Sequence, residues 1–217
     1  MTPDQNAQTI ISKLMEKKLS FAIITGRFEE AGTLHEQETK NLQADLDIVF
    51  FDISRAQLHE KLLNLGLEHV EFNTYKYIAQ DKSILPIDIY IDFINTGYYS
   101  LFPIQKENLL DCDGYNIISE SDYIVYQILE PLIKFSGYKK RHWYRLKRYI
   151  DEGYFTSEIK ERLCSIVGCF LATCLIDTIS KKDHVDKKIV QLIKLRLLFK
   201  HGNFLRMMEQ RILKNGQ

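Results

Sequence analysis

The chain has 217 residues, and its 29 lysine and arginine residues balance its 29 aspartate and glutamate residues, so the formal net charge is zero. With 45% hydrophobic residues and only 10 glycines and 4 prolines, the composition excludes a disordered, collagen-like or low-complexity chain. Proteins that bind nucleic acids usually carry a basic surplus, so a nucleic-acid partner is not expected.

The first half of the chain mixes helical and strand patterns. The spacing of Ile10, Ile11 and Leu14 predicts a helix over residues 3–18. The other elements expected in this half are a strand over 20–25 that ends at Gly26, a polar loop over 27–43, a strand over 44–52, a helix over 54–65 that begins at a serine cap and ends at Gly66, and strands over 69–73, 74–80 and 84–93.

The second half is helical in pattern from Ser119 onward. Helices are expected over 123–135, 139–152, 157–179, 186–200 and 204–214, and Pro131 is expected to kink or break the first of them. The two patterns together predict an α+β domain over residues 1–112, followed by a C-terminal helical domain over residues 113–217.

The cysteines and the apolar runs bear on the cellular setting. Cys112, Cys164, Cys169 and Cys174 fit no common zinc spacing, and we expect buried, reduced thiols. No signal-peptide pattern opens the chain, and the longest uncharged run, residues 163–176, is too short for a bilayer span. A cytoplasmic protein without a membrane span is therefore expected. The six histidines show no metal-like spacing such as H-x-x-x-H, so surface or packing roles are expected for them.

Aspartates inside strand patterns are the informative feature of the first half. Asp45 and Asp47 are two residues apart and project from one face of a strand, and Asp88, Tyr90 and Asp92 do the same on a later strand. Aspartate is a poor strand former, and neighbouring carboxylates repel one another unless a cation neutralises them. Carboxylate oxygens on rigid strands suit Mg²⁺, whose remaining positions are filled by water or phosphate. The pattern therefore predicts a divalent-metal site.

These motifs resemble a known family. A strand followed by Gly26 and Arg27, then Asp45-Leu46-Asp47 before an apolar run, and later Ile91-Asp92-Phe93, is similar to the nucleotidyltransferase superfamily of the DNA polymerase β type. The likeness is greatest to small bacterial members encoded among surface-polysaccharide genes, and it covers residues 19–95. It implies a nucleotidyltransferase-like mixed β-sheet flanked by helices, followed by a helical bundle.

The resemblance also implies roles for single residues. Gly26 faces the nucleotide phosphates. Asp45, Asp47 and a third carboxylate on a neighbouring strand hold two Mg²⁺ or Mn²⁺ ions, and the third carboxylate also helps to activate the acceptor hydroxyl. Asp92 is favoured for that third role because it ends a strong strand pattern, and Asp88 is the alternative. The family usually has serine after the glycine, whereas Arg27 stands here and could clamp a phosphate instead.

A basic segment of the second half is a further candidate for binding phosphate. Residues 134–148 contain seven lysines and arginines and no acid, with aromatic residues interleaved. Such a segment is either a solvated helix face or a contact for a triphosphate. We select Lys139, Lys140 and Arg145 as candidate nucleotide-binding residues.

Two function classes follow from these patterns. The first is a metal-dependent nucleotidyltransferase that moves NMP from an NTP, expected to be ATP, to a small-molecule, sugar or protein acceptor, and such a protein is an enzyme. The second is a non-catalytic or regulatory, antitoxin-like binding module on the same fold, which the departure at Arg27 favours. Binding of Mg²⁺ with a nucleotide, and turnover of that nucleotide, distinguish the two classes.

Overall fold

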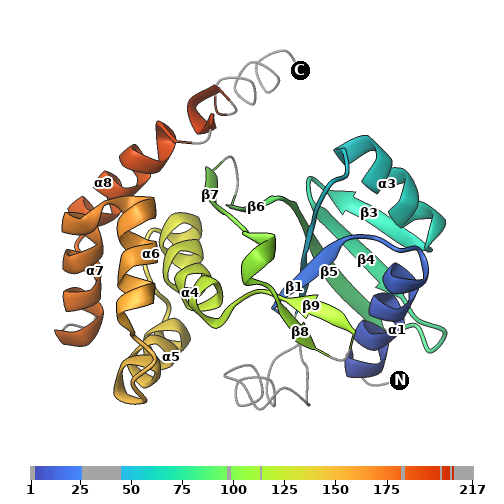
Figure 1. The fold of residues 1–217 in the computed structure, drawn as a ribbon, viewed down its shortest axis with the longest axis horizontal. Coiled ribbons are helices and arrows are strands. Elements are labelled where there is room, and N and C mark those ends of the chain that lie inside the picture. Colours follow the sequence, from blue (N-terminus) through green and yellow to red (C-terminus); the bar gives the residue numbers. More distant parts are fainter. Residues whose placement is uncertain are drawn as a thin grey trace. The chain divides into compact units, whose positions relative to one another are not determined.

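The computed structural model describes residues 3–25, 45–96, 99–112, 114–181, 184–200, 202–205 and 207 (Figure 1). Gly26, Arg27 and the expected polar loop over 27–43 lie outside these residues, as does most of the helix expected over 204–214. The chain divides into two units. The first joins Met1–Phe93 to Ile104–Glu120, and the second joins Ile94–Pro103 to Ser121–Gln217.

The first unit is a mixed β-sheet with helices. Its described elements are α1 (Pro3–Glu16), β1 (Phe21–Thr25), β2 (Leu46–Phe50), α3 (Arg55–Asn64), β3 (Leu67–Glu71), β4 (Thr74–Ile78), β5 (Ile84–Ile91), the 3₁₀-helix η2 (Lys106–Asn108), β8 (Leu110–Cys112) and β9 (Tyr115–Ile117). The strands lie in the order β3-β4-β5-β2-β1-β9-β8. β2 pairs in parallel with β5 and β1 in parallel with β9, whereas the other pairs on this path are antiparallel.

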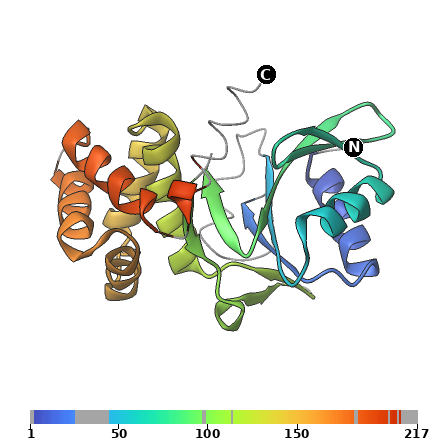
Figure 2. The same cartoon turned by 90° about the horizontal axis from the view of Figure 1, so that it is seen from above.

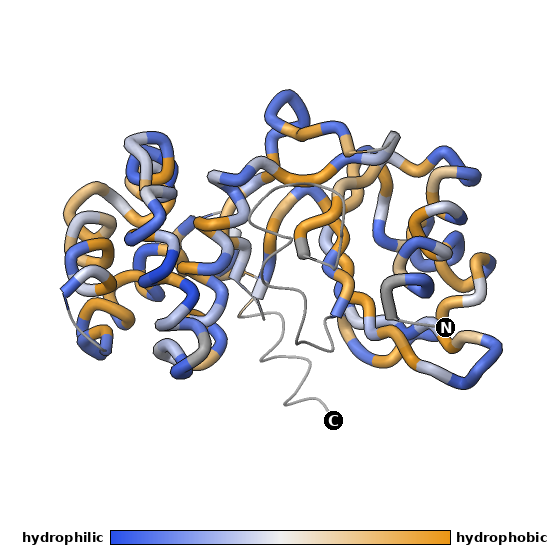
Figure 3. The backbone as a smooth tube through the Cα atoms, turned by 90° about the horizontal axis from the view of Figure 1, so that it is seen from below, coloured by the Kyte–Doolittle hydropathy of each residue, from blue (hydrophilic) through white to orange (hydrophobic). Residues whose placement is uncertain are grey.

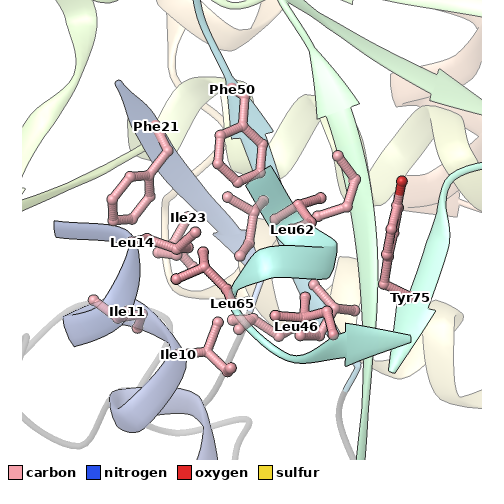
Figure 4. Close-up of a cluster of buried hydrophobic side chains, with 14 of the residues drawn as sticks. Ile10, Ile11, Leu14, Phe21, Ile23, Leu46, Phe50, Leu62, Leu65 and Tyr75 are labelled. Carbon is pink, nitrogen blue, oxygen red and sulfur yellow. The ribbon is translucent and has the colours of Figure 1, made fainter. Parts of the chain in front are cut away.

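Alternation along the central strands sorts their side chains between two faces of the sheet. Leu46, Ile48 and Phe50 of β2 lie in the hydrophobic core with Ile10 and Leu62 from the helices (Figure 4). α1 and α3 supply these helical residues because each buries one amphipathic stripe. The residues between them on β2 face the other side of the sheet, and one of these is Asp47.

The start of α3 is fixed by a capping box. Ser54 accepts a hydrogen bond from the Gln57 backbone N–H, and the Gln57 side chain accepts one from the Ser54 N–H at 3.2 Å. The expected serine cap is therefore confirmed. Gly66 follows the helix with φ +84°, a conformation that glycine adopts at little cost.

The second unit contains a short hairpin and a helical bundle, in which the helices coloured yellow to red gather together (Figure 2). Its described elements are β6 (Phe93–Thr96), β7 (Tyr99–Pro103), α4 (Glu120–Phe135), α5 (Lys140–Asp151), α6 (Ser157–Val167), α7 (Cys169–Lys181) and α8 (Lys187–Leu198). Hydrophobic and hydrophilic residues alternate along these helices every few positions (Figure 3). None of the helices in the described part of the chain is long and apolar enough to cross a membrane.

Several expectations about the second half are wrong. α4 spans the helix expected over 123–135 and continues through Pro131, so the break considered at Pro131 is absent, because burial of most of the helix surface outweighs one lost hydrogen bond. The single helix expected over 157–179 is two helices, which Gly168 separates with φ +88°. A Cβ at Gly168 would lie 3.0 Å from the guanidinium carbon of the flexible Arg196 side chain, which would have to shift by a few tenths of an ångström, so the positive φ is the main reason for glycine here.

The four cysteines also differ from expectation. All four are free thiols, but none is fully buried, and Cys169 is exposed at the first position of α7. The sequence pattern does not predict β6 to β9, because these strands are short and carry polar residues such as Asp111 and Asn116.

Polar contacts tie the hairpin to the helices within the second unit. The Ser100 N–H donates to Asn203 Oδ1 at 2.7 Å, and Asn203 Nδ2 donates to the carbonyls of Ser100 and Leu197 at 3.1 and 2.7 Å. Asn203 is fully buried, so these bonds replace the water that its amide loses on folding.

Candidate functional site

The two central strands of the first unit place two aspartates side by side. In the parallel pairing of β2 with β5, Asp47 is the register partner of Asp88. Neighbouring strands lie about 4.8 Å apart, and register partners project from the same face. The two carboxylates therefore lie next to one another on the face opposite the α1–α3 core.

This aspartate pair belongs to a row that crosses four strands. Thr25, the last residue of β1, is the register partner of Asp47, and Thr74 of β4 is the register partner of Asp88. The Thr74 hydroxyl donates a hydrogen bond of 2.7 Å to Asp88 Oδ1. Gly26 follows Thr25 directly in the chain, so β1 ends beside the aspartate pair.

Burial strengthens the electrostatic repulsion between the Asp47 and Asp88 carboxylates. Asp47 is only 7% exposed and Asp88 is half-buried. Two carboxylates at adjacent positions away from bulk water repel one another when both are ionised. A bound cation relieves that repulsion, so the pair is suited to hold a positively charged ligand.

Asp45 and Asp92 are placed differently. Asp45 directly precedes β2 and is exposed. Asp92 is exposed after the end of β5 with φ +56°, where its N–H donates to the Phe50 carbonyl and its own carbonyl accepts from the Ile104 N–H, each at 3.0 Å. Asp92 is four residues beyond Asp88, which corresponds to about 13 Å along a strand.

The structure thus brings together Asp47 and Asp88, and it places Asp92 at a separate position. Among the described residues, no group of three or more histidine, cysteine, aspartate or glutamate side chains is arranged to hold a metal ion. Mg²⁺ commonly binds proteins through only one or two carboxylates and completes its shell with water and substrate phosphates. Asp47 and Asp88 fit that smaller requirement.

Sequence reasoning missed Thr74 as a member of the site. Its only signal was a threonine at the start of a strand, and its relation to Asp88 depends on the pairing of β4 with β5. An ion pair lies beyond the end of β2, where Asp52, which has φ +56°, binds Lys106 of η2. Lys106 also lies 5.4 Å from the centre of the Phe51 ring.

The three predicted basic residues lie in the second unit. Lys139 precedes α5, and its Nζ lies 4.1 Å from the centre of the Phe135 ring. Lys140 Nζ lies 5.7 Å from the Tyr144 ring, and Arg145 Nη1 donates to Gln127 Oε1 of α4. Arg145 is therefore engaged within the bundle, and a nucleotide-binding role of all three residues stays a prediction.

A buried phenol anchors the turn that leads into this basic segment. The Tyr138 hydroxyl donates to the Ile128 carbonyl at 2.8 Å, and burial raises the pKa of Tyr138 well above its ordinary value of 10.0. A group with a raised folded-state pKa favours folding below its unfolded pKa, and this contribution is lost as the pH rises further.

We therefore expect the free energy of unfolding to fall above pH 10, and to fall less steeply in Tyr138→Phe, which has no phenol to ionise. Urea denaturation between pH 8 and 11 measures this slope. Tyr144→Phe, at an exposed position on α5, is the control. Equal slopes in the wild type and Tyr138→Phe would contradict the expectation.

One groove in the second unit has a volume of about 620 Å³. Its lining is apolar apart from two basic residues and comprises Phe170, Leu171, Leu192, Leu195, Arg196, Phe199 and Lys200. It contains none of the predicted site residues.

Searches of protein-family models, curated proteins and solved structures find no match to this chain.

Proposed function

We propose that this chain is a Mg²⁺-dependent nucleotidyltransferase that transfers NMP from an NTP, ATP in the first instance, to a small-molecule, sugar or protein acceptor. The observation that carries the proposal is the register of Asp47 with Asp88 on two parallel central strands, beside the end of β1. Gly26 follows β1 in the chain, at the point where the nucleotidyltransferase resemblance expects the triphosphate.

Within this proposal Asp47 and Asp88 hold the metal, and Asp45, which directly precedes β2, is a further ligand. Bound Mg²⁺ supplies neutralisation of the charge that develops on the α-phosphate and the departing pyrophosphate. Thr74 orients the Asp88 carboxylate through its hydrogen bond of 2.7 Å. We assign the third carboxylate role to Asp88 in preference to Asp92, because only Asp88 shares the row with Asp47.

A second candidate function is a non-catalytic binding module on the same fold. It is favoured by Arg27, which stands in the sequence where the nucleotidyltransferase resemblance expects serine. In that case Asp47 and Asp88 bind a metal nucleotide, or another cation, without turnover.

Thermal unfolding tests whether a metal nucleotide binds at all. A ligand that binds only the folded state stabilises it by RT ln(1 + [L]/Kd), which is about 2.7 kcal/mol at 100 times Kd. We expect ATP with Mg²⁺ to raise the melting temperature, and ATP with EDTA to leave it unchanged. Asp45→Asn/Asp47→Asn should remove the shift.

The two candidates then separate by product. Release of pyrophosphate that depends on Mg²⁺ supports the transferase, whereas a melting shift without pyrophosphate release supports the binding module. An identical melting temperature with and without Mg²⁺ and each of the four NTPs would contradict both.

A further inference from the structure

Two histidines that are ten residues apart in sequence lie in contact within the first unit. His59 comes from α3 and His69 from β3, and their ring centres are 5.3 Å apart with the ring planes at 89°. Tyr75 of β4 lies against both rings, with centre distances of 5.9 Å to His59 and 5.0 Å to His69. The three rings thus form a cluster at the junction of α3 with the β3–β4 hairpin.

Each histidine has one ring nitrogen bound to a protein oxygen. His69 Nε2 lies 3.1 Å from the Phe72 carbonyl oxygen, which can only accept a hydrogen bond. The neutral His69 ring therefore carries its proton on Nε2 and has a lone pair on Nδ1. His59 Nδ1 lies 2.7 Å from the Tyr75 hydroxyl oxygen. When Nδ1 donates to that oxygen, Nε2 of His59 has the lone pair.

This pattern is typical of metal-binding histidines. Such a histidine generally donates its second ring N–H to a protein oxygen, which fixes the tautomer and the orientation of the ring. In this cluster the oxygens are the Phe72 carbonyl for His69 and the Tyr75 hydroxyl for His59. The lone pairs are then on the other ring nitrogens, His59 Nε2 and His69 Nδ1.

The spacing and exposure of the rings fit one shared ion. Two imidazoles bound to a tetrahedral metal at about 2.0–2.1 Å have ring centres about 5 Å apart. The observed separation of 5.3 Å agrees with that value. His69 is exposed and His59 is half-buried, so an ion can enter from solvent and retain water in its other positions.

We propose that His59 and His69 form a two-histidine site for a divalent transition-metal ion, Zn²⁺ or Cu²⁺. Imidazole nitrogen suits these ions, whereas Mg²⁺ prefers oxygen ligands, so the site is chemically distinct from the Asp47–Asp88 pair. The bound ion links α3 to β3 and thereby stabilises the first unit. This proposal does not depend on the nucleotidyltransferase function.

One neighbouring charge limits the affinity. Arg55 Nη2 donates to the same Phe72 carbonyl at 2.7 Å and to Asn73 Oδ1 at 2.6 Å. A guanidinium this close to His69 repels a dication. Arg55→Gln is therefore expected to tighten metal binding, and Tyr75→Phe, which removes the oxygen that orients His59, is expected to weaken it by about 10-fold.

Calorimetric titration of the full chain with CuCl₂ and with ZnCl₂ tests the site, after the cysteines have been reduced and alkylated and the reductant has been removed. We expect one site for which Cu²⁺ binds more tightly than Zn²⁺. His59→Gln and His69→Gln should each weaken binding at least 10-fold, and the control His184→Gln, at an exposed histidine of the second unit, should not. The Cu²⁺ electron paramagnetic resonance spectrum should show coupling to two nitrogens.

Folding of the variants is checked by circular dichroism without metal. A Zn²⁺-dependent rise in melting temperature that EDTA reverses in the wild type, and that is missing in both glutamine variants, supports the site. Equal affinity in the wild type and His69→Gln overturns the proposal, as does a wild type that binds neither ion, and the cluster is then aromatic packing alone.

Discussion

Asp88→Asn is expected to lower Mg²⁺-dependent nucleotide turnover by about 100-fold or more, because it removes one of two adjacent anionic metal ligands while preserving the shape of the side chain. Asp47→Asn should have a loss of the same order. Asp92→Asn should keep turnover within about threefold of the wild type, since Asp92 lies four positions, or about 13 Å, from Asp88. Pyrophosphate release at saturating ATP and Mg²⁺ measures all three variants.

Two further measurements sharpen this comparison. Thr74→Val keeps the volume of the side chain but removes its hydrogen bond to Asp88, and a loss of about 10-fold is expected from the looser carboxylate. The melting temperature of each variant without ligand shows that it is folded. Loss of turnover in Asp92→Asn together with normal turnover in Asp88→Asn would reverse the assignment of the third carboxylate.

Arg162→Met is expected to cost about 3 kcal/mol of unfolding free energy, the largest stability change that we predict. Arg162 Nε lies 2.8 Å from Asp122 Oδ1, its Nη2 donates to the Pro103 carbonyl at 2.7 Å, and the Asp122 side chain is only 3% exposed. Methionine preserves much of the packing against Phe102 but removes the positive charge from a buried carboxylate.

Urea denaturation at pH 7 measures this cost, and Lys181→Met is the matched control. Lys181 pairs with Asp177 at 3.5 Å, but the two side chains are 72% and 60% exposed, so a change within about 0.5 kcal/mol is expected. Adding Asp122→Leu to Arg162→Met should recover part of the loss, because no buried charge then remains at that position. A loss of less than 1 kcal/mol in Arg162→Met would contradict a stabilising role of the pair.

The sequence predicted the elements with a strong local signal. The helix that carries Ile10, Ile11 and Leu14, the serine cap at Ser54 and the strand that follows Asp45 are each set by neighbouring residues, and all are present. The α+β class with a helical C-terminal region is confirmed for the same reason. Such elements depend on contacts between residues close in sequence, so they can be predicted without knowing the rest of the fold.

The relation between strands was not available from such local signals. Asp88 and Asp92 fall on the same face of the alternating sequence pattern, whereas in the structure Asp88 pairs with Asp47 and Asp92 lies beyond the end of β5. That register depends on the packing of a whole sheet, as does the contact of Thr74 with Asp88. Likewise His59 and His69 have no recognisable metal spacing in sequence, and the meeting of α3 with β3 places them together.

The predictions of where helices of the second unit break were wrong for a different physical reason. Pro131 is unfavourable within a helix when considered alone, but burial of α4 compensates for it. Gly168 has a helical pattern on both sides, so periodicity alone predicts one continuous helix across it. In both places the outcome depends on the sum of local preference and tertiary packing.

The hydrogen bonds between Ser100 and Asn203 have a consequence for the order of events during synthesis. These residues are separated by 103 positions, so β7 leaves the ribosome long before its partner is made. At a translation rate of about 5–20 residues per second, that interval is roughly 5–20 s. The strand must remain unpaired with Asn203 for that time, while β8 and β9 are already available to complete the sheet of the first unit. The nascent chain is therefore expected to complete the mixed sheet of the first unit first, and β7 is expected to bind Asn203 only after residue 203 has been made.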